Sequence, residues 1–170
     1  MKLGLADYLS LSRIPLAFIF VLLLFTFYDS YVLLTVLILT ILSDVFDGFL
    51  ARNLSSATDF GATLDPLCDK AFIILAFLGF LFLGRVSLII FFAIIIRDIY
   101  SLSEILYIKF SKSKKVHKAG VFGKLTTTAQ FILIGVLIFQ INILLAPIVA
   151  LVFILSLFTV GDYVKGRWLK

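Results

Sequence analysis

Long apolar runs separated by short polar segments dominate the chain and predict membrane-spanning helices. The runs cover residues 14–28, 31–50, 64–83, 86–110, 122–141 and 143–164. Each approaches the roughly 20 residues that a helix needs to cross the hydrocarbon core of a bilayer. Tight turns are expected at 29–30, 84–85 and 142–147, and longer polar connections at 53–63 and 111–120. The pattern predicts an all-α integral membrane protein with six transmembrane helices.

The residues before the first run form a shorter and more mixed segment. Residues 1–12 alternate leucines with Lys2, Asp7 and serines, a pattern that predicts a short interfacial helix at the level of the headgroups. A signal peptide is the alternative interpretation, but the following apolar run is too long and no small-residue cleavage site follows Leu24. We therefore expect one membrane domain over 1–170, with the interfacial helix followed by a six-helix bundle over 13–164.

Composition supports the membrane assignment and limits other classes of protein. The chain has 170 residues, of which 62% are hydrophobic, and a mean hydropathy of +1.19. The net charge of +5 is compatible with nucleic-acid binding, but no soluble module remains to hold a duplex, so no nucleic-acid partner is expected. Cys68 is the single cysteine, and packing as a small apolar residue is favoured over metal binding.

The basic residues are distributed by side of the membrane. If the N-terminus is inside, the outer turns contain only Arg85, and Arg97 lies in the middle of a span. The inner ends then carry 13 of the 15 basic residues, namely Lys2, Arg13, Arg52, Lys70, Lys109, Lys112, Lys114, Lys115, Lys118, Lys124, Lys165, Arg167 and Lys170. The positive-inside rule then predicts that both termini are cytoplasmic.

Four carboxylates lie close together in this apolar chain. Asp44 and Asp47 are three residues apart, and Asp65 and Asp69 are four apart, so each pair shares one face if its segment is helical. Acidic residues near a lipid core are costly and usually functional. Their oxygen atoms suit hard divalent cations. The predicted topology brings all four to the inner part of the membrane, in a polar cavity open to the cytoplasm.

The spacing of these residues identifies a family pattern. Eight positions fit D-x2-D-G-x2-A-R-x8-G-x3-D-x3-D without gaps, namely Asp44, Asp47, Gly48, Ala51, Arg52, Gly61, Asp65 and Asp69. The sequence thus resembles the CDP-alcohol phosphotransferases, integral membrane enzymes of phospholipid synthesis whose core is six transmembrane helices after a short interfacial helix. The resemblance covers essentially the whole chain. Within the family, the sequence is most similar to the phosphatidylglycerolphosphate-synthase-like members.

The resemblance implies a metal-dependent site. The four aspartates would surround two divalent cations, Mg²⁺ or Mn²⁺, and Asp69 would take the proton from the acceptor hydroxyl, which attacks the β-phosphorus and releases CMP. Gly48, Ala51, Arg52 and Gly61 would contact the CDP-lipid. Gly48 and Gly61 allow close approach of the nucleotide, and the planar fork of Arg52 can bind a phosphate. Close helix packing is the alternative for Gly48, and an interface anchor is the alternative for Arg52.

Two further stretches resemble family elements. Residues 123–130 are similar to G-K-x-K-T-x-x-Q of glycerol-phosphate-type members, with Thr126 in place of the second lysine. Residues 6–13 partly match P-N-x-L-T-x-x-R and keep Arg13. Arg97 and Asp98 are neighbours on a predicted helix and point about 100° apart, so we expect Arg97 to line the cavity rather than pair with Asp98. Arg97 and Lys124 would then bind the phosphate of the acceptor alcohol.

These observations lead to a functional hypothesis. The protein would transfer a phosphatidyl-type group from a CDP-linked lipid, CDP-diacylglycerol or CDP-archaeol, to a small alcohol, with glycerol 3-phosphate preferred and inositol phosphate or another polyol as the alternative. Its active site would face the cytoplasm from the cell membrane, in contact with membrane lipids, and a homodimer is expected because family members often form one.

Two rival classes explain less of the sequence. A cation transporter accounts for the acidic residues but not for the matched glycines, and Arg52 would repel the transported ion. Asp29 is the one acidic residue near the outer side, so no path across the membrane is visible. A non-catalytic lipid-binding scaffold requires loss of a metal ligand, whereas all four aspartates are present.

Overall fold

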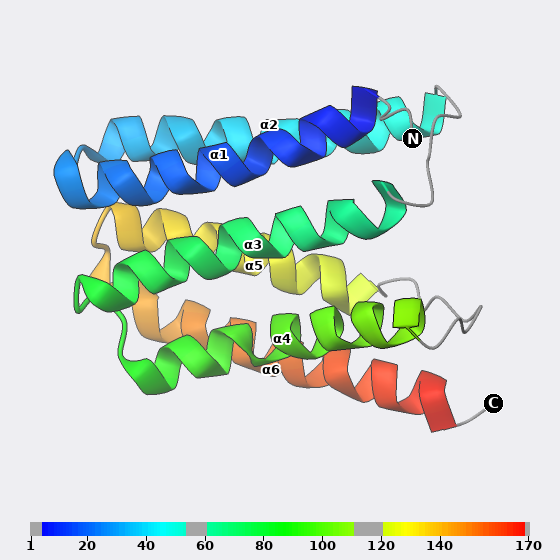
Figure 1. The fold of residues 1–170 in the computed structure, drawn as a ribbon. Coiled ribbons are helices and arrows are strands. Elements are labelled where there is room, and N and C mark those ends of the chain that lie inside the picture. Colours follow the sequence, from blue (N-terminus) through cyan, green and yellow to red (C-terminus); the bar gives the residue numbers. More distant parts are fainter. Residues whose placement is uncertain (1–4, 54–60, 111–120, 169–170) are drawn as a thin grey trace. The chain divides into compact units, whose positions relative to one another are not determined.

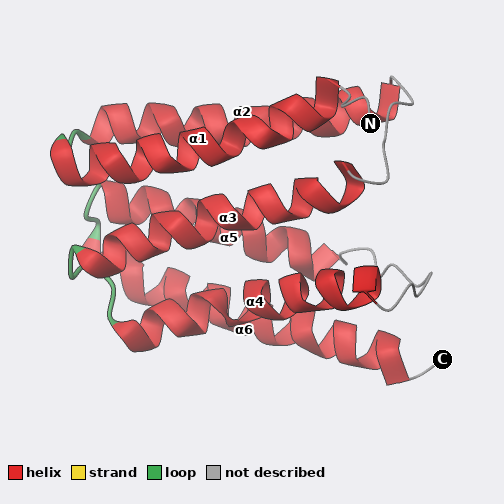
Figure 2. Ribbon diagram, in the orientation of Figure 1, coloured by secondary structure: helices red, strands yellow, loops and turns green. Residues whose placement is uncertain are grey.

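A computed structural model describes residues 5–53, 61–110 and 121–168, and side chains within 11–46, 67–103 and 121–161. Every regular element among these residues is an α-helix (Figures 1 and 2). The helices are α1 (Leu5–Thr26), α2 (Ser30–Asn53), α3 (Gly61–Phe82), α4 (Leu88–Phe110), α5 (Val121–Ile138) and α6 (Asn142–Trp168). The prediction of an all-α protein with six long helices is confirmed, and each helix coincides with one apolar run.

The beginning of the chain differs from the prediction. Residues 5–12 do not form a separate short helix but the first turns of α1, which continues to Thr26 and includes Pro15. The physical reason is local, because no glycine or turn sequence between Leu5 and Arg13 interrupts the helix. Within the described residues, the first helix therefore unites the segment expected at the interface with the first apolar run.

The reversal between α5 and α6 also lies elsewhere than predicted. The expected turn at 142–147 is wrong, since α6 begins at Asn142 and contains Pro147. The chain turns at 139–141 instead, where Gln140 has a φ of 54°. The Ile141 N–H donates to Val136 O at 3.1 Å and the Gln140 N–H to Leu137 O at 3.4 Å, a Schellman end to α5. Glycine usually occupies the left-handed position of this motif, so the glutamine at position 140 did not indicate a turn in the sequence.

The turn between α1 and α2 lies where the sequence predicts it. One carboxylate oxygen of Asp29 accepts hydrogen bonds from the backbone N–H groups of Tyr31 at 2.8 Å and Val32 at 3.2 Å. These groups lie in the first turn of α2 and have no acceptor within the helix. Asp29 is therefore the N-cap of α2.

The chain forms two compact units, and the first comprises residues 1–83. In this unit α1 packs against both α2 and α3. The ring of Phe20 on α1 lies 5.5 Å from that of Phe72 and 6.3 Å from that of Phe80, both on α3. A Cβ added to Gly79 would come within 2.7 Å of the side chain of Leu24. The missing side chain thus allows α1 and α3 to approach closely, as small residues do between membrane helices.

The second unit comprises residues 84–170 and contains α4, α5 and α6. Here α6 packs against both α4 and α5. Leu133 and Ile134 on α5, Ile94 on α4 and Val152 on α6 are fully buried. The rings of Phe122 and Phe158 stack at 5.6 Å between α5 and α6. The core of this unit is therefore apolar, apart from the polar network described below.

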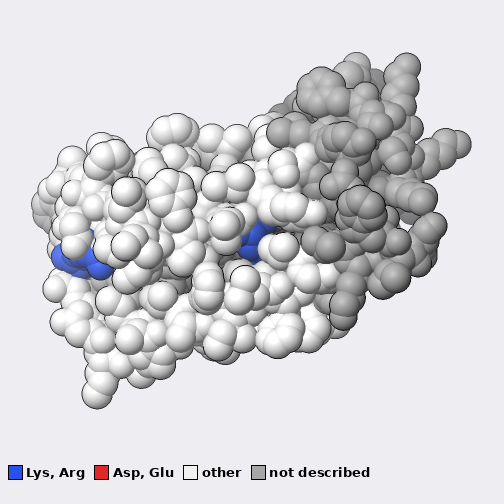
Figure 3. Space-filling model, turned by 90° about the horizontal axis from the view of Figure 1, so that it is seen from below, with Lys and Arg blue, Asp and Glu red and all other residues white. Residues whose placement is uncertain are grey.

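Many of the exposed side chains are large and apolar. Two helical segments, Val121–Ile138 and Asn142–Gly161, are long and apolar enough to cross a bilayer. Shorter apolar stretches lie in Leu11–Thr26 and Ser30–Phe46. Large apolar side chains such as Phe18 and Ile143 are exposed, and the described surface in Figure 3 is uncharged apart from small basic patches. The many exposed large apolar side chains favour contact with lipid.

Candidate active site

Carboxylates from two helices of the first unit meet on one guanidinium group. Arg13 on α1 lies with Nη2 3.2 Å from Oδ1 of Asp44 on α2, and its Nη1 forms an ion pair with Oδ1 of Asp69 on α3. The Arg13 side chain is 1% exposed, whereas those of Asp44 and Asp69 are 48% and 33% exposed. The fold therefore joins two of the predicted metal ligands through a buried cation and leaves both carboxylates partly exposed, although Oδ1 of Asp69 is buried.

The apolar stripes of α1 and α2 explain how these residues come together. On α1, Arg13 is followed at helical spacing by Ala17, Phe20 and Leu24, all buried. On α2, Leu33, Leu37 and Thr40 are buried at the same spacing and lead to Asp44. Burial of the two stripes turns the charged residue at the end of each toward the neighbouring helices.

The other predicted carboxylates occupy consistent backbone positions. Asp47 lies one helical turn after Asp44 in α2, and Asp65 lies one turn before Asp69 in α3. Each pair thus shares a helix face, as predicted. The side chains of Asp47 and Asp65 lie outside the described part of the structure. The described side chains alone contain no group of three His, Cys, Asp or Glu able to hold a metal, and the four-carboxylate site remains a prediction.

The expected contacts with the CDP-lipid also remain predictions. Gly48, Ala51 and Arg52 lie in the last turns of α2, and Gly61 is the first residue of α3. Their side-chain surroundings lie outside the described residues. The backbone nevertheless confirms that both parts of the eight-residue pattern are helical.

Asp44 and Asp69 fit a divalent cation by the chemistry of their donor atoms. Both contribute carboxylate oxygens, which Mg²⁺ and Mn²⁺ prefer over nitrogen or sulfur. One guanidinium group reaches both carboxylates, so a single cationic centre lies within range of residues from α2 and α3. The carboxylates of Asp44 and Asp69 thus hold one positive charge between α2 and α3.

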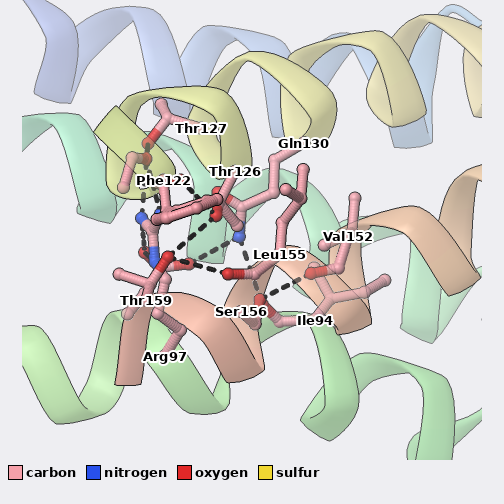
Figure 4. A network of polar contacts seen from close by, with 12 residues as sticks. Ile94, Arg97, Phe122, Thr126, Thr127, Gln130, Val152, Leu155, Ser156 and Thr159 are labelled. Carbon is pink, nitrogen blue, oxygen red and sulfur yellow. Dashed lines mark hydrogen bonds and ion pairs between the residues drawn. The ribbon is translucent and has the colours of Figure 1, made fainter. Parts of the chain in front are cut away.

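A second polar cluster lies in the second unit, around Arg97 on α4 (Figure 4). Arg97 donates to Oδ1 of Asp98 from Nε at 3.1 Å and from Nη2 at 2.5 Å. The expectation that these neighbours do not pair is wrong. Their Cβ atoms point in different directions, but the long arginine side chain folds back far enough for its guanidinium to reach the adjacent carboxylate. Arg97 and Asp98 are 3% and 0% exposed, so the pair is buried.

Helix α5 provides the other partners of this pair. Arg97 Nη1 donates to Gly123 O at 2.8 Å and Nη2 to Thr127 Oγ1 at 3.3 Å. Gln130 Nε2 donates to Asp98 Oδ2 at 2.6 Å and to Ile94 O at 3.1 Å. The sequence analysis missed the roles of Asp98, Thr127 and Gln130. Their signal is the spacing of Gly123, Thr127 and Gln130, which places all three on one face of a helix.

The remaining motif residues of α5 face different surroundings. Lys124 is exposed. Thr126, which replaces the second lysine of the family pattern, is 0% exposed. Its hydroxyl donates to Phe122 O at 2.8 Å and lies 3.2 Å from the hydroxyl of Thr159 on α6 (Figure 4). Position 126 is thus part of the packing between α5 and α6, and a lysine there would be buried.

Apolar helices with two carboxylates held on one buried guanidinium group are compatible with a membrane enzyme or with an ion transporter. Comparison with known families decides between these possibilities. The model of the CDP-alcohol phosphatidyltransferase family matches residues 3–160. The chain belongs to the CDP-alcohol phosphatidyltransferase family, and it is a phosphatidyltransferase of phospholipid biosynthesis. The resemblance read from the eight-residue pattern is confirmed.

Individual relatives narrow the comparison. The chain is 34% identical over 143 residues to the CDP-diacylglycerol–glycerol-3-phosphate 3-phosphatidyltransferase of Aquifex aeolicus, covering 80% of this chain and 78% of that protein. It is 31% identical over 128 residues to a Mycobacterium tuberculosis protein named "Probable phosphatidylglycerophosphate synthase", with 72% and 59% covered. A human cardiolipin synthase (CMP-forming) is 30% identical over 83 residues, 48% of this chain and 28% of that protein.

Proposed function

We propose that this protein transfers the phosphatidyl group of CDP-diacylglycerol to glycerol 3-phosphate and releases CMP. The observation that carries the proposal is the meeting of Asp44 and Asp69 on one cationic group, in a chain that belongs to a phosphatidyltransferase family. The acceptor follows from the names of the Aquifex and mycobacterial relatives. An ether-linked CDP-lipid such as CDP-archaeol is the alternative donor.

Each part of the eight-residue pattern has a proposed role in the transfer. Asp44, Asp47, Asp65 and Asp69 hold two divalent cations, Mg²⁺ or Mn²⁺. When bound, these ions supply a clamp on the pyrophosphate and stabilise the charge that develops during displacement. Asp69 accepts the proton of the acceptor hydroxyl. Gly48, Ala51, Arg52 and Gly61 hold the CDP end of the donor.

Arg97 and Lys124 are proposed to bind the phosphate of the acceptor. Four N–H groups of the Arg97 guanidinium are engaged by Asp98, Gly123 and Thr127, which leaves one N–H of Nη1 available with respect to the described residues. Gly123 directly precedes Lys124, whose side chain is exposed. The contact with Gly123 O therefore brings the Arg97 guanidinium to the turn of α5 that carries the lysine.

Thr126 in place of a lysine keeps inositol phosphate or another polyol phosphate as alternative acceptors. Membership of a transferase family replaces the cation transporter considered from the sequence alone.

The proposed setting is the cell membrane, with six helices crossing it and both termini in the cytoplasm. Two apolar helices of sufficient length and the distribution of basic residues support it. The active site then faces the cytoplasm, where the water-soluble acceptor is available. We propose a homodimer as the assembly, by analogy with family members.

Release of CMP tests the proposed function. The purified protein in liposomes is given CDP-diacylglycerol, Mg²⁺ or Mn²⁺, and glycerol 3-phosphate, inositol phosphate or glycerol in separate reactions. Metal-dependent CMP release with glycerol 3-phosphate, lost in Asp69→Asn and kept in Asp29→Asn, supports the proposal. CMP release with inositol phosphate alone corrects the proposed acceptor. If no CMP is released with any acceptor, with either an ester-linked or an ether-linked CDP-lipid as donor, the proposed activity is rejected.

A further inference from the structure

Two buried arginines in this protein differ in the exposure of their acidic partners. Arg97 pairs with Asp98, which is 0% exposed, so the carboxylate of this pair is closed to other ligands. Arg13 is equally buried, but its partners Asp44 and Asp69 are 48% and 33% exposed. Oδ1 of Asp69 is buried, so a ligand can reach Asp44 and Asp69 only through the exposed parts of their carboxylates, without first opening the helix packing around the arginine.

The contacts of Arg13 also solve an electrostatic problem. Asp44 and Asp69 both place Oδ1 against the same guanidinium group, so their two negative charges lie close together. Like charges at such separation repel strongly where water is scarce. The single positive charge of Arg13 lies against both carboxylates, offsets one of their two charges and links α1 to α2 and α3.

We propose that Arg13 is the built-in counter-ion of the metal site, which offsets part of the negative charge of Asp44 and Asp69 when no divalent cation is bound and opposes cation binding through its own charge. The proposal deepens the proposed function, because it rests on these carboxylates being metal ligands. A unit charge and a divalent ion a few ångströms apart repel by an amount worth roughly tenfold in affinity even in a medium as polar as water. Arg13 thus makes the site stable without metal, at the expense of affinity for it.

Direct metal binding tests this without substrate. The full chain in detergent is titrated with Mn²⁺, and the free ion is measured by electron paramagnetic resonance. Arg13→Met is expected to bind Mn²⁺ about tenfold more tightly than the parent, because the repelling charge is gone. Arg13→Lys keeps the charge and is expected to stay within about threefold of the parent. Arg85→Met, which removes the same charge from a residue of the second unit that contacts Leu137 O, is the matched control and is expected to bind as the parent does.

A stability measurement forms the second arm. Without metal, Arg13→Met is expected to unfold at a lower temperature than the parent, and adding Asp44→Asn to it should restore part of the loss by removing one uncompensated charge. If Arg13→Met alone does not fold, the comparison of Arg13→Met/Asp44→Asn with Asp44→Asn gives the same test of Mn²⁺ affinity.

The outcomes separate this inference from the proposed function. Equal or weaker Mn²⁺ binding on removal of the Arg13 charge overturns it, since a residue that only positions the carboxylates would weaken the site when lost. A parent that binds Mn²⁺ with the predicted dependence on Arg13 but releases no CMP rejects the proposed function and leaves the inference intact. A parent that releases CMP while Arg13→Met binds Mn²⁺ more weakly rejects the inference alone.

Discussion

The side-chain amide of Gln130 on α5 donates to the carboxylate of Asp98 on α4 across 2.6 Å, and both residues are fully buried. Asp98 also accepts two hydrogen bonds from Arg97, so one carboxylate balances a buried charge and connects two helices. Buried charges are tolerated when they are paired and hydrogen-bonded in this way. The network of Figure 4 therefore holds the residues proposed to bind the acceptor.

Replacing Asp98 with alanine should destabilise the second unit strongly. Arg97 would remain buried without its counter-ion, which costs about 3–5 kcal/mol. Thermal unfolding in detergent, followed by circular dichroism, measures the loss. Asp98→Asn keeps the shape of the side chain and one acceptor oxygen, and a smaller loss is expected. Equal stability of the parent and Asp98→Ala would show that the pair does not hold α4 and α5 together.

Thr126→Lys should not restore the family pattern but disrupt the packing of α5 on α6. The position is fully buried and hydrogen-bonded to Phe122 and Thr159, so a lysine would lose its hydration. We expect a loss of about 3 kcal/mol or more in the free energy of unfolding.

Thr126→Ser is the matched control for this substitution. It keeps the hydroxyl and removes one methyl group, for which about 1 kcal/mol is expected. A Thr126→Lys protein that is as stable as the parent and more active toward glycerol 3-phosphate would contradict the buried environment of position 126.

Substitutions of Arg97 and of Lys124 should have different effects on activity and stability. Lys124 is exposed, so Lys124→Gln should raise the KM for the acceptor alcohol and leave the unfolding temperature near that of the parent. Arg97→Lys should lower both activity and stability, because an ammonium group cannot reproduce the contacts with Asp98, Gly123 and Thr127. Steady-state kinetics with varied acceptor concentration checks the first effect. An unchanged KM in Lys124→Gln would exclude the lysine from the acceptor site.

Removal of the metal should abolish CMP release, and loss of one of its proposed ligands should weaken the reaction. Excess chelator is expected to stop the reaction, and added Mg²⁺ or Mn²⁺ to restore it. Asp69→Asn should lower kcat by about 10²–10⁴-fold, because its carboxylate is the proposed proton acceptor. Asp44→Asn should instead raise the metal concentration needed for half-maximal rate.

Asp29 provides the control for the carboxylate variants. Its carboxylate caps α2, and asparagine caps nearly as well, so Asp29→Asn should retain parental activity. Full activity in the presence of chelator would show that the transfer does not depend on a metal.

The sequence by itself determined the helices and which aspartates belong to the predicted metal site. Apolar runs such as 31–50 and the i, i+3 and i, i+4 spacing of aspartates are local patterns, and helix formation depends on local hydrogen bonds. The motif spacing then identified the family, because it preserves chemistry that the whole family requires. Asp29 was also predicted as a turn residue, because it lies at a polar break between two apolar runs.

Only the tertiary structure decided which charged groups meet. The sequence identified Arg13 only as a basic residue of the inner side and as part of a family element, and the packing of α1 on α2 and α3 joins it to Asp44 and Asp69. Arg97 reaches Asp98 because its side chain folds back and α5 supplies further acceptors, which helix periodicity does not encode. These contacts depend on interhelical packing and on the rotamers of long side chains. They are therefore set by the folded chain as a whole.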